Sequence, residues 1–213
     1  MPKLEEILLN ATQAYQRLLN IEYIVTVGKN KELKTYKLQF TTDEYKHLFG
    51  LHKLDDRLDI KRSPSNAVFE SIINGKINCS YVVSSKNYAR IRKRVENIAD
   101  LEEYIDQFNQ IYDWNMVKAR SDIHGDRMVP SISIKDAKNN IYIFFNDGGI
   151  ESTELRIGDI VIGEFNIEIP ISFIVEPHKD YTANLVRPAT VLYKEKSDKS
   201  TQTKVTLLDK LSK

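Results

Sequence analysis

Cysteine is almost absent from this chain of 213 residues, which contains only Cys79. One thiol cannot form an intramolecular disulfide, and it cannot supply a zinc site built from several cysteines. This scarcity is typical of a reducing compartment, so we expect a cytoplasmic protein that folds without disulfide or metal. We expect Cys79 itself to be a small buried apolar residue rather than a catalytic thiol.

Long apolar runs and an excess of one charge are also missing. No stretch approaches the roughly 20 apolar residues of a membrane-spanning helix. Acidic residues interrupt the segment 1–6, where a signal peptide would need an apolar core, so we expect neither secretion nor membrane insertion. The 31 Lys and Arg residues nearly balance the 30 Asp and Glu residues. Any attraction for phosphate must therefore be local rather than a property of the net charge.

Several enzyme signatures are absent as well. The sequence has no Gly-rich phosphate loop, no nucleophile elbow and no His-Glu-x-x-His zinc helix, which excludes the enzyme classes that depend on them. Its 41% hydrophobic and 29% charged residues are typical of a globular protein. We expect one domain over residues 1–196, followed by a flexible tail, 197–213, in a region rich in Lys, Ser and Thr.

The first half of the chain shows helical periodicity and capping signals. Apolar residues recur at helical spacing from Leu4 to Leu19 and predict an amphipathic helix. The runs 21–27 and 33–40, separated by a turn, predict a hairpin. Start and stop signals predict further helices at 43–49, at 64–73, after Ser85 and at 100–111.

The second half changes to the pattern of β-strands. Turn signals at 138–140 and 147–149 separate the first three apolar runs. Helices followed by strands are typical of an α+β fold, in which N-terminal helices pack on an antiparallel sheet. The predicted strands are 128–134, 141–145, 157–162, 167–175 and 190–194.

One segment combines acid–base and phosphate-binding side chains at close spacing. If Gly50 ends the helix 43–49, His47 lies in its last turn, and His52 and Lys53 lie just beyond it. A histidine can transfer a proton, and a neighbouring lysine can stabilise the charge that develops on a phosphorane, without a metal. The alternative is structural: a histidine favours a helix C-terminus through the dipole, and Lys53 can simply pair with Asp55 or Asp56.

Two other segments can contribute to an anionic site. The basic cluster 90–94 can contact RNA phosphates, although a solvated helix face opposite an apolar stripe is the interpretation that we favour. Ser172 lies late in a predicted strand and precedes the polar loop 177–182, which contains a histidine, a tyrosine and hydroxyl side chains. Loops of this kind at a sheet edge often carry binding sites.

The order of these segments resembles the phage and mobile-element nuclease domains grouped as barnase/EndoU/colicin/RelE-like (BECR). The resemblance is most specific to the group with a His-Leu-x-Gly-x-His-Lys signature, here His47 to Lys53, and it covers residues 33–196. A helical lead-in comes first, and the segments that carry the resemblance are then Lys37 to Phe40, His47 to Leu54, Arg90 to Arg94, Ile141 to Phe145, Ser172 and Phe173, Asp180 to Thr182, and Val191 to Lys196.

This resemblance implies a BECR-like fold and metal-independent cleavage of RNA by the ribose 2′-hydroxyl, with no cofactor. RNA is then the expected partner, together with a possible cognate antitoxin or defence-system protein. The catalytic residues that it implies are His47, His52, Lys53, Ser172 and Tyr181. The expected substrate-binding residues are Arg57, Arg90, Arg94 and Thr182.

Two segments are longer than the short connections typical of such domains. Residues 111–126 and 149–170 are longer than a bare connection requires. Insertions of this kind can carry a partner surface or block a cleft. The alternative hypothesis is therefore a catalytically inactive BECR-like interaction protein that acts in phage defence or counter-defence.

Overall fold

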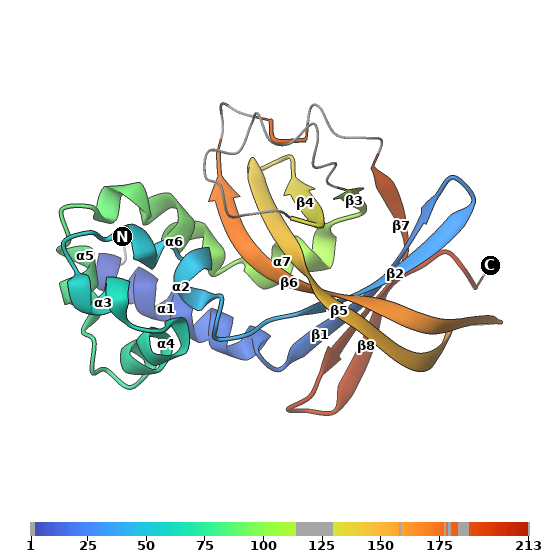
Figure 1. Cartoon of the computed structure of the whole chain (residues 1–213), viewed down its shortest axis with the longest axis horizontal. Helices are drawn as coiled ribbons and strands as arrows, with labels where there is room; N and C mark the ends of the chain where they lie inside the picture. Colours follow the sequence, from blue (N-terminus) through green and yellow to red (C-terminus); the bar gives the residue numbers. More distant parts are fainter. Residues whose placement is uncertain are drawn as a thin grey trace.

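The computed structural model describes residues 3–113, 130–157, 159–176, 178, 180–182 and 188–212. A cluster of helices lies at one end and an eight-stranded sheet at the other (Figure 1). The predicted α+β class is therefore confirmed. The expected insertion 111–126 lies outside the described residues from position 114 onward.

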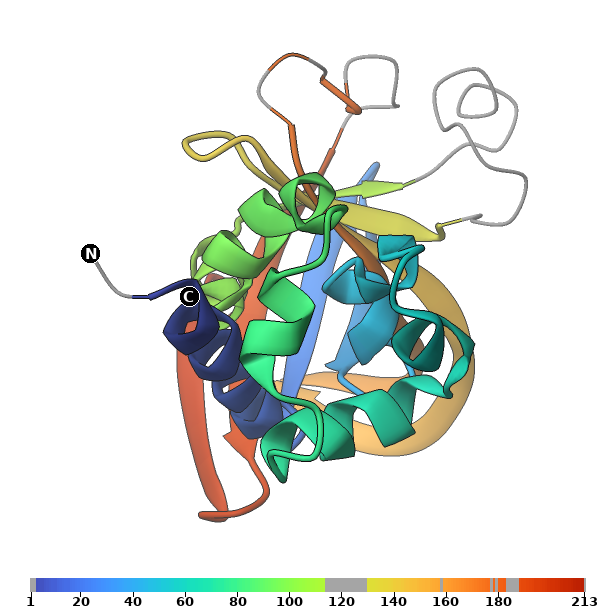
Figure 2. The same ribbon diagram turned by 90° about the vertical axis from the view of Figure 1, so that its left-hand side faces the viewer.

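The helical cluster is formed by the first half of the chain, as its periodicity predicts. In the first helix, α1 (Leu4–Leu18), the apolar stripe is buried. The helix packs against α4, α5 and α6 and lies at the edge of the helical group in Figure 2. The remaining helical elements are α2 (Tyr45–Leu48), η1 (Leu51–Lys53), α3 (Leu58–Arg62), α4 (Ser65–Ile73), α5 (Cys79–Val83), η2 (Tyr88–Arg90), α6 (Arg92–Ile98) and α7 (Leu101–Gln107). Cys79, at the start of α5, is half-buried rather than fully buried.

The strands pair in the order β1-β2-β6-β5-β4-β3-β7-β8, and β1 also pairs with β7. This additional pairing closes the first seven strands of the order into a ring. The described pairs are antiparallel except β2 with β6, so the sheet is mostly antiparallel. The strands are β1 (Ile21–Lys29), β2 (Glu32–Gln39), β3 (Gln110–Asp113), β4 (Ile132–Asp136), β5 (Ile141–Ile157), β6 (Ile160–Val175), β7 (Ala189–Asp198) and β8 (Thr203–Asp209).

Strands β5 and β6 form one long hairpin, where the sequence predicts three shorter strands. The predicted turn at 147–149 is a bulge within β5: Gly149 has φ of 106° and donates its N–H to Asp147 Oδ1 at 2.7 Å. The register with β6 shifts at this point, but the pairing continues to Ile157. The expected insertion 149–170 therefore forms the extended part of the hairpin.

The segment that the sequence predicts to be a flexible tail contains the strand β8. It pairs antiparallel with β7 from Tyr193 opposite Asp209 to Asp198 opposite Thr203. Threonine and valine favour strands, and an edge strand leaves its polar side chains in water. The polar composition of this segment is therefore compatible with a strand, which the sequence argument overlooked.

The helix predicted to run to residue 111 ends earlier, at Gln107. Buried Lys194 of β7 donates from Nζ to the backbone carbonyls of Ile105, Asp106 and Phe108 at 2.9, 3.0 and 2.5 Å. This ammonium satisfies carbonyl groups that the helix end leaves without partners. The chain then turns and continues as β3.

One continuous hydrophobic core joins the two parts. It includes Tyr15, Phe49 and Ile91 of the helical cluster and Leu38 and Phe173 of the sheet. The helices are therefore held firmly against the sheet. Within the part of the chain that the structure describes, no helix combines the length and apolar character needed to cross a membrane.

Candidate functional site

Gly50 fixes the position of the histidine-containing segment. Its φ of 75° lies in the left-handed region that glycine adopts most easily, and it follows the short helix α2. A Cβ at this position would lie 2.9 Å from Ile91 Cγ2 and 3.4 Å from Arg94 Cδ. Glycine is therefore needed both for the turn and for the close approach to α6, which brings the segment 47–53 against Arg94.

The two imidazoles of this segment lie side by side. The ring centroids of His47 and His52 are 4.7 Å apart and the rings are tilted by 35°. The side chain of His47 is exposed, whereas His52 is half-buried. His52 Nδ1 is buried and has no hydrogen-bond partner among the described atoms. The pair therefore presents the exposed imidazole of His47 and, next to it, a buried His52 Nδ1 that has no described partner.

Burial and nearby positive charge keep both imidazoles neutral at pH 7. Burial, followed by the charge of Lys46, lowers the pKa of His47. Burial also lowers the pKa of His52 to about 4; the charges of His47, Lys53 and Arg94 add to this effect, and a hydrogen bond with the backbone of Lys46 opposes it. A neutral imidazole is the form that can accept a proton.

Lys53 and Arg94 add two cations to the site. Burial, followed by the charges of Arg94 and Arg90, lowers the pKa of Lys53 to about 8. Arg94 donates from Nη1 to the carbonyl oxygen of His47 at 3.4 Å. No described carboxylate forms an ion pair with Lys53 or Arg94. The two cations are therefore available to an anionic ligand.

The structural alternative for Lys53, pairing with Asp55 or Asp56, does not occur. Asp55 instead forms ion pairs with Lys61 at 2.7 Å and with Arg90 at 3.1 Å. Arg90 also donates to the carbonyl oxygen of Lys53 at 3.4 Å. It therefore belongs to the same group of side chains, although Asp55 neutralises part of its charge.

Arg57 is directed toward α5 rather than toward the imidazoles. Its Nε donates to the carbonyl oxygen of Tyr81 at 2.9 Å, and its Nη2 donates to Ser84 Oγ at 3.0 Å. The guanidinium carbon lies 4.3 Å from the centroid of the Tyr81 ring. The sequence-predicted role of Arg57 in substrate binding therefore requires a contact at some distance from His47.

The later polar residues lie on one face of the sheet. Ser172 of β6 is opposite Phe144 of β5 and is only 3% exposed. Tyr181 packs edge-on against the rings of Tyr142 and Phe144, with centroids 5.2 and 5.9 Å away. Ser172 and Tyr181 are thus both neighbours of Phe144.

Arg94 links Tyr181 to the imidazole group electrostatically. Burial and the charge of Glu176 raise the pKa of Tyr181, and the positive charge of Arg94 acts against them. Thr182, in contrast, is occupied by Asp180: its Oγ1 donates to Asp180 Oδ1 at 2.6 Å. The structure therefore groups the signature residues with Arg94, whose charge also acts on Tyr181, but it does not place Thr182 toward an open anion site.

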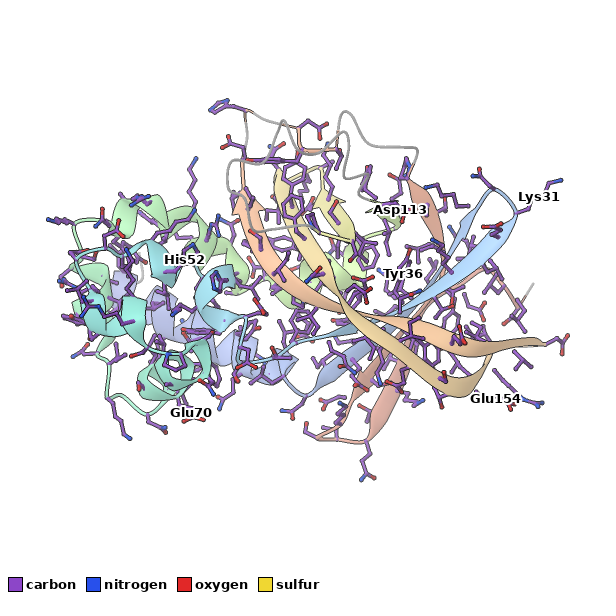
Figure 3. All side chains as sticks on the ribbon, in the orientation of Figure 1. Lys31, Tyr36, His52, Glu70, Asp113 and Glu154 are labelled. Carbon is purple, nitrogen blue, oxygen red and sulfur yellow. The ribbon has the colours of Figure 1, made fainter. Side chains whose placement is uncertain are left out.

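Sequence reasoning missed the contacts that anchor the segment carrying Tyr181. Asp180 accepts hydrogen bonds from Lys135 at 2.8 Å and from Tyr142 at 3.2 Å. A Lys-to-Asp pair 45 residues apart leaves no local signal in the sequence. In Figure 3 His52 lies among the helices, well separated from Tyr36 and Asp113 in the sheet. The candidate site is therefore at the helical end of the molecule.

The α+β fold, with helices packed on a mostly antiparallel sheet, is consistent with a BECR-like domain. The family model described as phage-Barnase-EndoU-ColicinE5/D-RelE like nuclease4 matches residues 7–211. The chain belongs to this family, and the predicted resemblance to BECR-like nuclease domains is confirmed at the level of the family. The match begins before residue 33 and continues beyond residue 196, so it includes most of α1 and all of β8. No curated protein and no solved structure gave a match.

Proposed function

We propose that this chain is a metal-independent endoribonuclease of phage or mobile-element origin that cleaves RNA by 2′-hydroxyl transesterification. The observation that carries the proposal is the group formed by His47, His52, Lys53 and Arg94. Neutral imidazoles 4.7 Å apart supply bases, and the two cations have no described carboxylate as partner. Metal-independent cleavage of a phosphodiester depends on proton transfer and anion stabilisation by side chains such as these.

In the proposed reaction His47 is the base because its ring is the accessible one. It takes the proton of the ribose 2′-hydroxyl, whose oxygen attacks the adjacent phosphorus. The bond from phosphorus to the 5′ oxygen breaks, and that oxygen takes up a proton from water, while His47 releases the proton that it accepted to the solvent. The products are a 2′,3′-cyclic phosphate and a 5′-hydroxyl. His52 packs against His47 and supports its orientation.

The cations stabilise the pentavalent phosphorane. Lys53 is protonated at pH 7 because its pKa, although lowered, is about 8. Arg94 contacts the His47 carbonyl oxygen and acts electrostatically on Tyr181. Either Tyr181 or Ser172 completes the phosphate contacts, and Tyr181 has the better support because Arg94 couples it to the imidazole group. Arg90 provides a contact for a neighbouring phosphate.

Cleavage of RNA in excess chelator tests the proposal. Purified protein should produce fragments that end in 2′,3′-cyclic phosphate. His47→Ala should abolish them, and His52→Ala, which removes the support of the His47 ring, should reduce them. The matched control is His178→Ala, since His178 is also exposed but lies in the loop after β6. Strict dependence on magnesium, or equal activity of the His47 variant and the wild type, would rule the mechanism out.

The second candidate is a catalytically inactive interaction protein in phage defence or counter-defence. The balance of 31 basic and 30 acidic residues favours it, since RNA-binding proteins usually carry a basic excess. A pull-down from cells distinguishes the two candidates. The second requires a stoichiometric protein partner, such as an antitoxin or a defence protein. It also requires that the double variant His47→Ala and His52→Ala keep its function in cells.

A further inference from the structure

We propose that Tyr81 and Arg57 form a stacking subsite for an unpaired nucleobase, so that the preferred substrate is single-stranded RNA. The inference rests on the proposed nuclease function and specifies its substrate class. It comes from an exposed aromatic platform on α5 that the cleavage mechanism does not use. Figure 1 shows α5 beside α3 in the helical cluster, far from the sheet.

Tyr81 is both exposed and held in place by its neighbours. Its side chain is 39% exposed, which is unusual for a large aromatic residue in this structure. The Arg57 guanidinium covers one face at 4.3 Å from the ring centroid. The hydroxyl donates to Asp59 Oδ1 at 2.8 Å. Because these contacts use one face and the hydroxyl, we infer that the exposed area includes the opposite face or the ring edge.

Arg57 is itself immobilised before any ligand arrives. It donates to the carbonyl oxygen of Tyr81 and to Ser84 Oγ, and its Nη1 lies 3.5 Å from Asp56 Oδ2. Asp56 in turn accepts hydrogen bonds from Ser85 at 2.5 Å and from Asn87 at 3.1 Å. A platform fixed in this way loses little conformational entropy when a base stacks on it.

Stacking on an aromatic ring suits nucleobases of any sequence, because every base has a flat π face. Bases inside a duplex are already stacked on one another, so only an unpaired base can occupy the Tyr81 face. The chemistry of the platform therefore favours a single strand over a duplex.

The platform lies within reach of the proposed cleavage site. Arg57 follows Lys53 by four positions, and a chain of that length spans at most about 14 Å. Arg90 bridges the interval, because it contacts both the carbonyl oxygen of Lys53 and the carboxylate of Asp55. One oligonucleotide can thus place a phosphate between Lys53 and Arg94 while a nearby base lies on Tyr81.

Binding of an uncleavable oligonucleotide tests the subsite without depending on catalysis. The probe is a short 2′-O-methyl RNA strand with 2-aminopurine bases, which lacks the attacking hydroxyl. Tyr81→Leu should weaken its binding about tenfold, as expected for the loss of one stacked base. Tyr81→Phe keeps the ring and should bind within about twofold of the wild type. Leu58→Ala, a nearby exposed apolar truncation, should also leave binding unchanged.

Two further measurements keep the test decisive if Tyr81→Leu is unstable. The wild type should quench 2-aminopurine fluorescence, and a duplex of the same sequence should bind about tenfold more weakly than the single strand, because it offers no unpaired base. Equal binding by Tyr81→Leu that melts like the wild type, equal binding of the duplex, or no oligonucleotide binding at all overturns the proposal. A peptide partner on this face would give the last of these results.

The outcomes also separate this inference from the proposed function. Tyr81-dependent binding without RNA cleavage would retain the subsite and remove the nuclease mechanism. If cleavage needs His47 but is unchanged by Tyr81→Leu, and if single strands and duplexes are cleaved equally, the nuclease mechanism would be retained and the subsite would be removed.

Discussion

Two polar clusters in this molecule carry opposite charges and occupy separate places (Figure 3). The first lies among the helices and consists of His47, His52, Lys53 and Arg94. The second lies in the sheet around Glu168 of β6, where burial, with the charges of Asp147 and Asp113 adding to it, raises the carboxyl pKa to about 7. Burial thus shifts acids and bases in opposite directions, and in each case it favours the neutral form.

The clusters differ in how their charges are satisfied. In the sheet, Ser131 donates a hydrogen bond to Glu168, and Asp113 accepts from Lys29 at 2.6 Å and from Tyr36 at 3.4 Å. Partners within the protein therefore satisfy these acids. In the helical cluster, Arg94 has only a backbone carbonyl as its described hydrogen-bond partner. Charges without an internal counter-ion are the ones that a ligand can use, which is why we place the site there.

Removal of one group from each cluster should give the largest contrast. His47→Ala should lower the rate of RNA cleavage by between about 100-fold and 10,000-fold, because it deletes the general base. Glu168→Gln should leave the rate within about threefold, well below the contribution of a general base. Initial rates on a defined RNA, with melting curves for both variants, check this. A Glu168→Gln variant that folds normally and is as inactive as His47→Ala would reverse the assignment of the site.

A methyl group at Gly50 should destabilise the segment that carries His47 and His52, because the backbone of Gly50 is left-handed and lies close to Ile91. Gly50→Ala should destabilise the fold by about 3 kcal/mol, from left-handed strain and from the clash with Ile91. Gly75 is the matched control, since its φ of 69° is similar but a Cβ placed there would meet no atom within 4 Å. Gly75→Ala should cost only about 1 kcal/mol. Urea unfolding of both variants measures the difference, and equal losses would mean that contact with α6 is unimportant.

Protonation of Glu168 should make stability depend on pH in the sheet cluster. Its folded pKa of about 7 exceeds the ordinary value of 4.5, so the folded state binds this proton more tightly. The stabilisation is complete below about pH 4.5 and is lost as pH rises through 7. Relative to Glu168→Gln, the wild type should lose on the order of 2 kcal/mol over this range. Parallel pH dependence in the two proteins would contradict the buried, protonatable state.

Local sequence predicted the elements whose signals are short in range. Gly50 as a helix stop and the stripe from Leu4 to Leu18 both correspond to the structure. The Asp147 to Gly149 segment did not become a turn, because a bulge uses the same left-handed glycine and only the distant pairing with β6 distinguishes the two. Likewise β8 depends on β7 rather than on its own composition.

In the candidate site, too, contacts between sequence neighbours were predictable and contacts between distant segments were not. His47, His52 and Lys53 are neighbours in sequence, so their proximity was predictable. The approach of Arg94 depends on how α6 packs against Gly50. The backbone and hydroxyl partners of Arg57 come from α5 and its C-terminal end, and they leave no pattern near that residue. Sequence thus predicted which side chains of the signature lie together, but tertiary contacts decided which cations have no described carboxylate as partner.

The smallest expected effect is on the pH profile of cleavage, which should reflect the lowered pKa values of His47 and Lys53. Because the pKa of His47 is below its ordinary value of 6.5, the acid limb of the rate profile should lie at lower pH than that of an ordinary imidazole. On the alkaline side the rate should decline as Lys53 loses its proton near pH 8. Rates measured from pH 5 to 9 on one RNA test both limbs. Lys53→Arg should move the alkaline limb upward, since arginine keeps its charge; an unchanged limb would assign that ionisation to another group.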